Sequence, residues 1–423
     1  MLDIKTIREN PLAVEENLKK RQDPEIIRKF HKFLDIDKTY LELLNKIQNL
    51  RHERNKLSKE ITTFLRDRKK FSELSKKAKN LDKKIKELEL KLRGISLERR
   101  NLLLQIPNLL HKDVPFGKSD ADNKVIKEFG KKPKFFFKPL SHVEIIKNLN
   151  LVDLERAAKI SQSRFYFLKG KLALLDLALC KYAIDFLNER GFTFLIPPHL
   201  MNRFHYEGVT SLEDFENVMY KVENEDLYLI ATSEHPLIAM HSNEIFNEEE
   251  LPIKYSAFSV NFRKEAGTHI KQEKGIWRVH QFNKIEQIIL CKQEESWKFF
   301  DELINNTIEF FSSLEIPFRQ VEVCTGDIGI VASRKYDLEA WIPSAKKYME
   351  IASCSNCTDY QANRLKIRYK LKNGIKKSVH TLNSTCVATT RAIVAILENF
   401  QQEDGSIKMP KILHKYCGFK EIP

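Results

Sequence analysis

Two adjoining stretches with a regular spacing of apolar residues constrain this fold more than any other feature. In the first, apolar residues recur every three, four or seven positions, at Tyr40, Leu43, Ile47, Leu50, Leu57, Ile61 and Phe64. Arg54 is the only charged residue along this apolar line. In the second, steps of three and four alternate, at Phe71, Leu74, Ala78, Leu81, Ile85, Leu88, Leu92 and Ile95. Each spacing predicts a helix with one narrow apolar stripe. Because only the basic segment LRDRKK separates them, we predict an antiparallel coiled coil over about residues 27–105, roughly 50–60 Å long at about 1.5 Å per residue.

The positive charge of the chain is concentrated on this predicted arm. The 423 residues carry a formal net charge of +14, and residues 51–100 alone contain 18 Lys and Arg against 8 Asp and Glu, an excess of +10. A solvated helical surface and a phosphate-binding arm both account for this excess. Charge alone leaves the two interpretations open.

The pattern changes after Pro107. The turn-rich segment HKDVPFGKSDADN marks a domain boundary, so we predict an arm at 1–110 and a second domain at 111–423. Short strand-like runs follow, interspersed with helices such as 292–312 and 391–402: FTFLIPP, LYLIATSE, KYSAFSVNFR, IWRVHQFNKIEQIILCK, FRQVEVCTGD and KYMEIASCSN. Because few helical crossovers separate these runs, we predict an α+β fold, with an antiparallel sheet flanked by helices.

Several common kinds of site and segment are missing from the sequence. It has no GxxxxGK[ST] phosphate loop and no GxGxxG after a strand. It also has no apolar run near the roughly 20 residues that cross a bilayer, and MLDIKTIRENPLAVEEN lacks the order of a secretory signal. We therefore expect a cytoplasmic protein without a membrane partner.

The seven cysteines are an odd number spread through the chain, which suits reduced thiols, so we expect no disulfides. Cys354 and Cys357 read CSNC, which could suggest zinc or redox chemistry. The chain has neither a second CxxC nor an HxxxH at zinc spacing, so a structural role is favoured.

The stretch NFRKEAGTHIKQEKGIWRVHQFNKIE predicts a hairpin with strands 257–265 and 277–290. Residues two apart on a strand share a face, so Arg263 and Glu265 are expected to point the same way. An arginine for a phosphate, an acceptor for an amino group and the Phe282 ring for a base would together hold a nucleotide. Arg and Glu on one strand are more often a surface ion pair, so the hairpin alone is a weak signal.

This stretch resembles motif 2 of the class II aminoacyl-tRNA synthetases, and FRKEAG followed by RVHQFNKIE resembles the seryl-tRNA synthetase version. Four further stretches agree: GFTFLIPPHLMN resembles motif 1, TSEHPL the serine-site loop, MEIASCSNCTDYQANR another seryl-type signature, and LNSTCVATTRAIVAILENFQ motif 3. MLDIKTIRENP is similar to the family's N-terminus. The resemblance implies a class II catalytic domain behind a tRNA-binding coiled coil.

The resemblance also implies roles for individual residues. Arg263 and Arg391 would be catalytic, Phe282 and Arg391 would sandwich adenine, and Glu265 would accept from its amino group. The implied ATP site is Arg263, Lys264, Glu265, Arg278, Val279, Phe282, Glu350, Ile351, Ala352, Ser353 and Arg391. The implied serine site is Thr232, Ser233, Glu234, Arg263, Glu286, Asn383 and Thr385. Glu350 and Ser353 would bind Mg²⁺, whose hardness suits oxygen ligands.

The implied activity is ATP-dependent conversion of L-serine to seryl-adenylate and transfer of serine to tRNA(Ser), by a homodimer formed through motif 1. Pro197 and Pro198 in motif 1 could mark a plain strand edge, but the resemblance favours a dimer interface. A non-catalytic tRNA-binding paralogue is the main alternative, although such proteins usually lose the arginines that stand here at 263 and 391. A coiled-coil interaction protein would not explain five ordered motifs.

Some positions depart from the family pattern. Ser384, Cys386 and Thr390 stand where motif 3 commonly has glycines, and Ala352 stands where a serine is usual. The motif 2 loop reads THIKQEKG, which keeps Lys271 and Lys274 but lacks the usual arginine. The missing loop arginine predicts altered ATP affinity or altered contacts with the acceptor end of the tRNA, and the motif 3 departures place side chains where the family has bare backbone.

Overall fold

The computed structural model describes residues 1–64, 66–211, 218–265 and 275–423. The chain forms two compact units: the first comprises Met1, Thr6–Lys19 and Asp23–Pro107, and the second comprises Leu2–Lys5, Lys20–Gln22 and Asn108–Pro423. Within the described ranges, no helix is long and apolar enough to cross a membrane.

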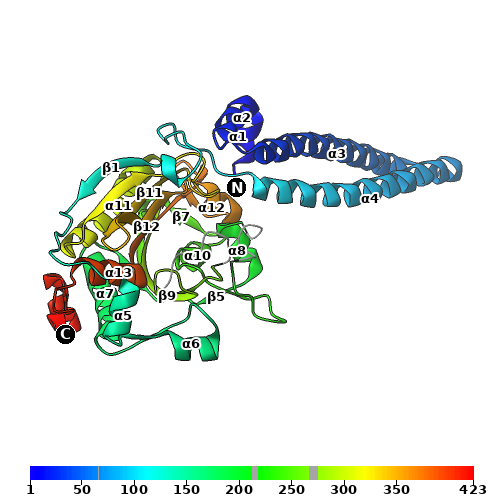
Figure 1. Cartoon of the computed structure of the whole chain (residues 1–423). Helices are drawn as coiled ribbons and strands as arrows, with labels where there is room; N and C mark the ends of the chain where they lie inside the picture. The colour runs from blue at the N-terminus through cyan, green and yellow to red at the C-terminus, as the bar shows by residue number, and fades with distance from the viewer. Residues whose placement is uncertain (65, 212–217, 266–274) are drawn as a thin grey trace. The chain divides into compact units, whose positions relative to one another are not determined.

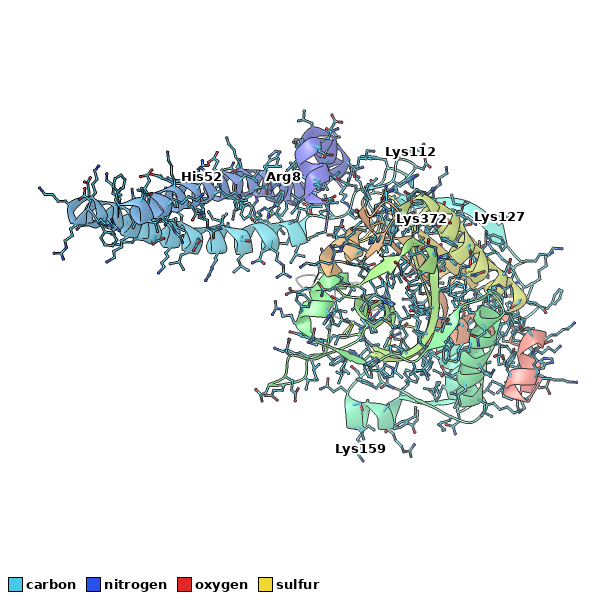
Figure 2. All side chains as sticks on the ribbon, turned by 180° about the vertical axis from the view of Figure 1, so that it is seen from behind. Arg8, His52, Lys112, Lys127, Lys159 and Lys372 are labelled. Atoms are coloured by element: carbon cyan, nitrogen blue, oxygen red, sulfur yellow. The ribbon has the colours of Figure 1, made fainter. Side chains whose placement is uncertain are left out.

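The first unit is helical. Its helices are α1 (Ile4–Glu9), α2 (Pro11–Lys19), α3 (Pro24–Thr63) and α4 (Arg68–Gln105), and α3 and α4 lie side by side as an antiparallel pair (Figure 1). Every residue of the predicted apolar stripes is buried or half-buried except Phe71, which is 39% exposed. The predicted coiled coil is therefore confirmed. Figure 2 shows side chains projecting from both helices, with His52 labelled on α3.

Side-chain caps fix where the two long helices begin. The Asp23 carboxylate accepts a hydrogen bond from the backbone N–H of Glu25, and Pro24 occupies the first turn of α3. Asp67 accepts from the N–H groups of two residues in the first turn of α4. The polar segment between the apolar stripes therefore ends one helix and starts the next.

A buried carboxylate ties the base of the arm together. The Asp37 side chain on α3 is 6% exposed and forms ion pairs with Arg8 of α1 and Arg99 of α4. Burial by itself would raise the pKa of Asp37, but hydrogen bonds from the two guanidinium groups outweigh it and lower the pKa below the ordinary value. Asp37 therefore stays ionised and joins three helices of the first unit.

We expect the Asp37→Asn variant to lower the free energy of unfolding by about 1.5–3 kcal/mol at pH 7, because charge-assisted hydrogen bonds are lost. Because the pKa of Asp37 is lower in the folded protein, its ionised carboxylate stabilises the fold fully above the unfolded pKa of about 3.9. This stabilisation is lost as the pH falls through the folded pKa. The gap between wild type and variant should therefore close below about pH 3.9. Urea unfolding followed by helical circular dichroism measures it, and Asp35→Asn, at an exposed position of α3, is the control.

The second unit is built on one large sheet. Its strands are β1 (Lys124–Phe129), β4 (Thr193–Leu195), β8 (Ile253–Phe262), β9 (Gln281–Cys291), β10 (Phe318–Glu322), β11 (Arg334–Ile342), β12 (Lys347–Asn356) and β15 (His380–Ala388). They lie in the order β1-β10-β11-β12-β15-β9-β8-β4. All neighbours are antiparallel except β4 and β8, which are parallel. The predicted α+β class is confirmed.

Helices and short strands complete this unit. The helices are α5 (His142–Asn148), α6 (Leu154–Ser161), α7 (Lys171–Asn188), α8 (Arg203–Val209), α10 (Glu234–Ala239), α11 (Ser296–Ser313), α12 (Tyr360–Leu365), α13 (Thr389–Asn399) and α14 (His414–Cys417). The short strands are β2 (Val152–Asp153), β3 (Phe167–Leu168), β5 (Leu200–Met201), β6 (Tyr228–Leu229), β7 (Ile245–Asn247), β13 (Arg368–Lys370), β14 (Lys376–Ser378), β16 (Ile407–Lys408) and β17 (Glu421–Ile422). Apolar residues of α7, α11 and α13 pack with β9, β11, β12 and β15 in the main core. These helices cover the sheet in Figure 1.

Residues 20–22 belong to the second unit because of one buried arginine. The Arg21 guanidinium donates to the carbonyl oxygens of Ile328 and Asn108, both at 2.9 Å. Asn108 in turn donates through its amide to the carbonyl oxygens of Val331 and Cys357. Arg21 precedes the long helices in the sequence and Asn108 follows them. Both are thus fixed beside the segment before β11, and Asn108 also beside the segment after β12.

The sequence analysis missed β1, β11 and β15 as separate strands. β11 reads RKYDLEAWI, and its charged first half resembles a loop although Leu338, Ala340 and Ile342 alternate into the core. The predicted helices 292–312 and 391–402 correspond to α11 and α13, with ends shifted by one to four residues. The misses of β11 and β15 matter because these two strands carry part of the site described next.

Candidate active site

The hairpin that the sequence predicts over 257–265 and 277–290 is present, but its strand bounds differ. β8 begins four residues earlier and ends three residues earlier than predicted, and β9 begins four residues later and ends one residue later. β8 ends at Phe262 and β9 begins at Gln281, so Arg263, Glu265 and Arg278 lie beyond the paired region. The prediction that Arg263 and Glu265 share a strand face is therefore wrong. Glu265 has a positive φ of 45°, which turns the backbone out of the extended path. The alternation of side chains between the two faces of a strand applies only on β9, which contains Phe282 and, two and four residues later, the charged residues Lys284 and Glu286.

Backbone contacts hold the two ends of the hairpin loop together. The N–H of Arg263 donates to the carbonyl oxygen of His280 at 2.9 Å, and the His280 ring contacts the Arg263 carbonyl oxygen at 2.8 Å. Arg278 pairs with the Glu265 carboxylate at 3.3 Å. Lys271 and Lys274, which the sequence places in the motif 2 loop, lie outside the described residues.

A cavity of about 330 Å³ opens between this loop, the strands β9, β11, β12 and β15, and the start of α13. It is lined by Arg263, Glu265, Trp277, Arg278, Val279, Phe282, Lys284, Lys335, Glu350, Ile351, Ala352, Ser353, Thr385, Ala388, Thr390 and Arg391. Every residue of the implied ATP site lines it except Lys264. Parts of the chain more than 120 residues apart thus meet in one space.

The cavity is strongly cationic. Arg391 donates to the Glu350 carbonyl oxygen at 2.9 Å and lies 3.4 Å from its carboxylate. Burial would raise the pKa of Glu350, but the cations around it, Arg391 first and Lys335 second, lower it to about 2. Burial, with a contribution from Arg391, lowers the pKa of Arg263. More positive than negative side chains surround the space, which suits a polyanionic ligand.

Two aromatic rings face the cavity with cations near them. Arg263 lies 5.3 Å from the centre of the Phe282 ring, and Arg391 lies 5.7 Å from the centre of the Trp277 ring. Flat rings and guanidinium planes can stack on a nucleobase. The sequence analysis anticipated Phe282 but missed Trp277.

Several residues of the implied serine site form a second, buried cluster. Glu286 is 1% exposed and accepts from the Thr385 hydroxyl at 3.1 Å and the Asn383 amide at 3.3 Å. Lys284 joins the cluster, because its ammonium lies 2.7 Å from the Glu286 carboxylate and donates to the Thr232 hydroxyl at 2.7 Å. Within the implied site, Thr385 and Arg263 also line the cavity.

The segment after β6 completes this cluster. The Glu234 carboxylate accepts from the Gln361 amide at 2.9 Å. Burial, together with the charge of Glu286, raises the pKa of Glu234 to about 7. The Ser233 hydroxyl is fully buried with no hydrogen-bond partner in the part of the chain that the structure describes. Arg263 donates to the carbonyl oxygen of Ala231 at 3.3 Å, so it touches both the cavity and this segment.

The departures from the family pattern fall at different depths. Ser384 is fully buried, with its hydroxyl 2.9 Å from that of Thr307, and Cys386 is fully buried in the main core. Ala352 and Thr390 line the cavity. Ala352 and Thr390 can therefore alter contacts with a nucleotide directly, whereas Ser384 and Cys386 act through packing.

The CSNC pair lies in the interior. Cys354 and Cys357 are buried, and burial raises the pKa of both thiols, which keeps them protonated at neutral pH. Among the residues that the structure describes, no group of three or more His, Cys, Asp or Glu side chains could hold a metal ion. The Cys357 thiol lies 3.9 Å from the side-chain oxygen of Asn383.

Comparisons with known proteins agree with the geometry. Residues 219–400 match the family model for the tRNA synthetase class II core domain (G, H, P, S and T), and residues 1–110 match that for the seryl-tRNA synthetase N-terminal domain. The serine–tRNA ligase of Thermococcus sibiricus is 48% identical, over 100% of this chain and 97% of that protein. That of Methanospirillum hungatei is 48% identical over the whole of both chains. This chain belongs to the seryl-tRNA synthetase family.

Solved seryl-tRNA synthetases have the same fold. The Pyrococcus horikoshii enzyme complexed with ATP has a TM-score of 0.96 at 47% identity, covering 100% of this chain and 99% of that one. The cytoplasmic Naegleria fowleri enzyme in complex with AMP has a TM-score of 0.88 at 36% identity, covering 100% and 98%. The chain is accordingly an ATP-dependent serine–tRNA ligase, and the resemblance that the sequence analysis drew is confirmed.

The sequence analysis missed five cavity residues as ligands: Trp277, Lys284, Lys335, Ala388 and Thr390. Lys284 stands two residues from Phe282 and from Glu286, so alternation along the strand was its available signal. Trp277 stands five residues before Phe282, so alternation gave no signal for it. Lys335 lies outside every quoted motif. Its signal was the KYD sequence, in which a lysine and an aspartate stand two apart at the start of a strand.

Proposed function

We propose that the cavity binds ATP and that the buried cluster around Glu286 binds serine, so that the serine carboxylate attacks the α-phosphate beside Arg263. The observation that supports this most directly is the position of Arg263, which lines the cavity and also touches the segment before Thr232. Arg263 and Arg391 are then the catalytic residues, because their fixed charges stabilise the charge that develops on phosphate oxygens.

In this proposal, the nucleotide is bound by the predicted ATP residues that line the cavity. The adenine ring stacks between Phe282 and Arg391, and Glu265 accepts a hydrogen bond from its amino group. Arg278 both neutralises phosphate charge and orients Glu265 through their ion pair. Lys264 contributes through its backbone position, which is fixed by a hydrogen bond from its N–H to the carbonyl oxygen of Val218 at 2.7 Å.

Serine is recognised by groups that need a polar ligand. The ammonium is attracted by the carboxylates of the buried Glu286 and the half-buried Glu234, and the hydroxyl is hydrogen-bonded by members of the cluster that Glu286, Asn383 and Thr385 form. Ser233, whose hydroxyl lacks a partner within the described ranges, offers one more polar atom.

Mg²⁺ fits beside the phosphates. Glu350 and Ser353 both line the cavity and offer a carboxylate and a hydroxyl oxygen, and the low pKa of Glu350, about 2, keeps it ionised at neutral pH. When bound, the ion supplies positive charge to the phosphate oxygens. Glu350 also forms an ion pair with Arg391, so it positions the Arg391 guanidinium at this end of the cavity with or without the metal.

The remaining parts of the chain complete the proposal. The arm at 1–110 grips tRNA(Ser), which its excess of +10 between residues 51 and 100 supports, and 111–423 is the catalytic domain. Two chains form a homodimer through motif 1, where Ile196, just before the two prolines, is 67% exposed, and Phe204, two residues after the motif, is 52% exposed. The cytoplasmic location rests on the seven cysteines, which are all free thiols.

Serine-dependent exchange of labelled pyrophosphate into ATP tests the proposal. The wild type should exchange with serine and not with threonine, alanine or glycine. Arg263→Ala should reduce the exchange rate at least about 10²-fold, because one fixed electrostatic contact in the transition state contributes about 3–4 kcal/mol.

The matched control is Arg319→Ala, which removes an arginine that pairs with Glu339 on β11 and does not line the cavity. This control should exchange at the wild-type rate. If Arg263→Ala retained activity within a few fold of wild type, the cavity would not be the site of adenylate formation.

A further inference from the structure

Lys335 is a charged residue of the cavity to which the proposed function assigns no role. Lys335, on β11, lines the same cavity as Arg263, Arg278 and Arg391, and its side chain is 25% exposed. It is the second-largest cationic influence on Glu350, after Arg391. Lys335 is therefore close enough to the phosphate end of the proposed ATP site to act there.

The ammonium of Lys335 is held in a defined place. Asp337, two residues along β11 and therefore on the same face, has its two carboxylate oxygens 3.0 and 3.1 Å from the Lys335 nitrogen. Asp337 itself is 6% exposed, so it is fixed within the sheet. An ammonium has three donors, and one carboxylate does not use them all.

The surroundings argue against an ion pair that serves stability alone. Burying a charged pair costs desolvation energy that mutual attraction often fails to recover. Here the ammonium also faces a cavity lined by three arginines and two glutamates, and the Asp337 and Glu350 carboxylates attract its charge. A polyanionic ligand in the cavity adds a further attraction.

Charge moves in one direction during the proposed reaction. The serine carboxylate oxygen forms a bond to the α-phosphorus while the bond from that phosphorus to the bridging oxygen breaks. The electron pair goes to the bridging oxygen, and pyrophosphate leaves with it. A cation at the β- and γ-phosphates is therefore more strongly attracted in the transition state than in the ground state.

We propose that Lys335 is a further catalytic residue of adenylate formation, which binds the β- and γ-phosphates of ATP and stabilises the leaving pyrophosphate, with Asp337 as its positioning residue. This inference rests on the proposed ATP site. Lys335 keeps its proton throughout, since it acts by charge and hydrogen bonding.

Binding measurements on the full-length protein separate this role from a structural one. AMP lacks the β- and γ-phosphates, so Lys335→Met should weaken ATP binding at least about tenfold in calorimetry and leave AMP binding unchanged. Lys335→Arg should restore most of the ATP affinity, because it keeps the charge. Equal weakening of ATP and AMP, or no weakening of either, would overturn the inference.

Kinetics provide a second test. Lys335→Met should slow serine-dependent pyrophosphate exchange about 10²-fold, while the KM for serine and the transfer of serine from prepared seryl-adenylate to tRNA stay within about twofold. Asp337→Asn should give the same pattern with a smaller loss. Lys347→Met, at an exposed position of β12 outside the cavity, is the control.

The outcomes distinguish the two proposals. A wild type without serine-dependent exchange contradicts the proposed function itself. An active wild type with normal exchange in Lys335→Met contradicts only the role of Lys335. Loss of transfer from prepared seryl-adenylate in Lys335→Met would mean that the residue supports the whole fold of the site, and would equally overturn its assignment to pyrophosphate.

Discussion

Alanine should be activated at least about 10⁴-fold less efficiently than serine, measured as kcat/KM in pyrophosphate exchange. The two substrates differ by one hydroxyl, and a site built to hydrogen-bond that hydroxyl leaves its own buried groups unpaired when alanine binds. Glu286, Asn383 and Thr385 already form such a cluster, with Glu286 only 1% exposed. Threonine should be excluded for another reason, because its additional methyl group meets a closely packed interior.

The hydroxyl of Thr385 allows this explanation to be tested with a small change. Thr385→Val keeps the shape of the side chain and removes one hydrogen bond to Glu286, so the preference for serine over alanine should narrow by about tenfold or more. Thr389→Val is the matched control, because its hydroxyl bonds to the carbonyl oxygen of Asn283 outside the cluster. Alanine activation within about a hundredfold of serine in the wild type would mean that the polar pocket is wrong.

The helical arm was predictable from sequence because its signal is local. The apolar stripe from Tyr40 to Phe64 depends on a spacing that any helix imposes. The Asp67 cap of α4 likewise involves only residues at most three positions away in the sequence. The sheet was predictable in class for the same reason, since runs such as KYSAFSVNF alternate along one strand. Neither the prediction of the arm nor that of the sheet class depends on which strands become neighbours.

The candidate site was predictable only in part because its geometry depends on tertiary contacts. Arg263 and Glu265 were assigned to a strand, yet the chain leaves β8 at Phe262 and Glu265 takes a positive φ, held by the pairing of Arg263 with His280. Both residues line the cavity, but they lie beyond the strand that the sequence predicted for them. Ligand roles came from the family resemblance, and they remain proposals for every residue that the resemblance implied.

Lys284 and Lys335 show why charged residues in strands are easily missed. A lysine in a strand usually faces solvent, and alternation along one strand shows which residues share a face but not whether that face is buried. In the structure, β9 and β11 are central strands of the sheet, so both lysines face the interior of the site. Only the strand order, in which β11, β12, β15 and β9 are consecutive, brings them together with Glu286 and Glu350.

Shortening the arm should separate the two half-reactions. Arg51 on α3 pairs with Glu89 on α4 at 2.6 Å, which identifies residues at the same height of the coiled coil. Replacing residues 52–88 with a short loop therefore removes the outer part and retains the base that Asp37 joins. The removed segment contains 13 Lys and Arg against 6 Asp and Glu. Serine-dependent pyrophosphate exchange should stay near normal, because every proposed ATP and serine residue lies beyond residue 230.

Charging of tRNA by the shortened protein should fall by roughly 10³-fold or more at moderate salt, because several phosphate contacts are lost together. Each contact also contributes a slope of about −0.7 to −0.9 in log affinity against log salt, so the shortened protein should bind tRNA with a shallower salt dependence. Replacing exposed lysines of the same segment with glutamine keeps the helices and removes only charge, for example at Lys69, Lys70, Lys76 and Lys79. That variant should lose part of the affinity and part of the slope while its exchange activity is unchanged. Undiminished charging after the shortening, or an unchanged salt slope, would mean that the basic surface is only solvated and that the tRNA is held elsewhere.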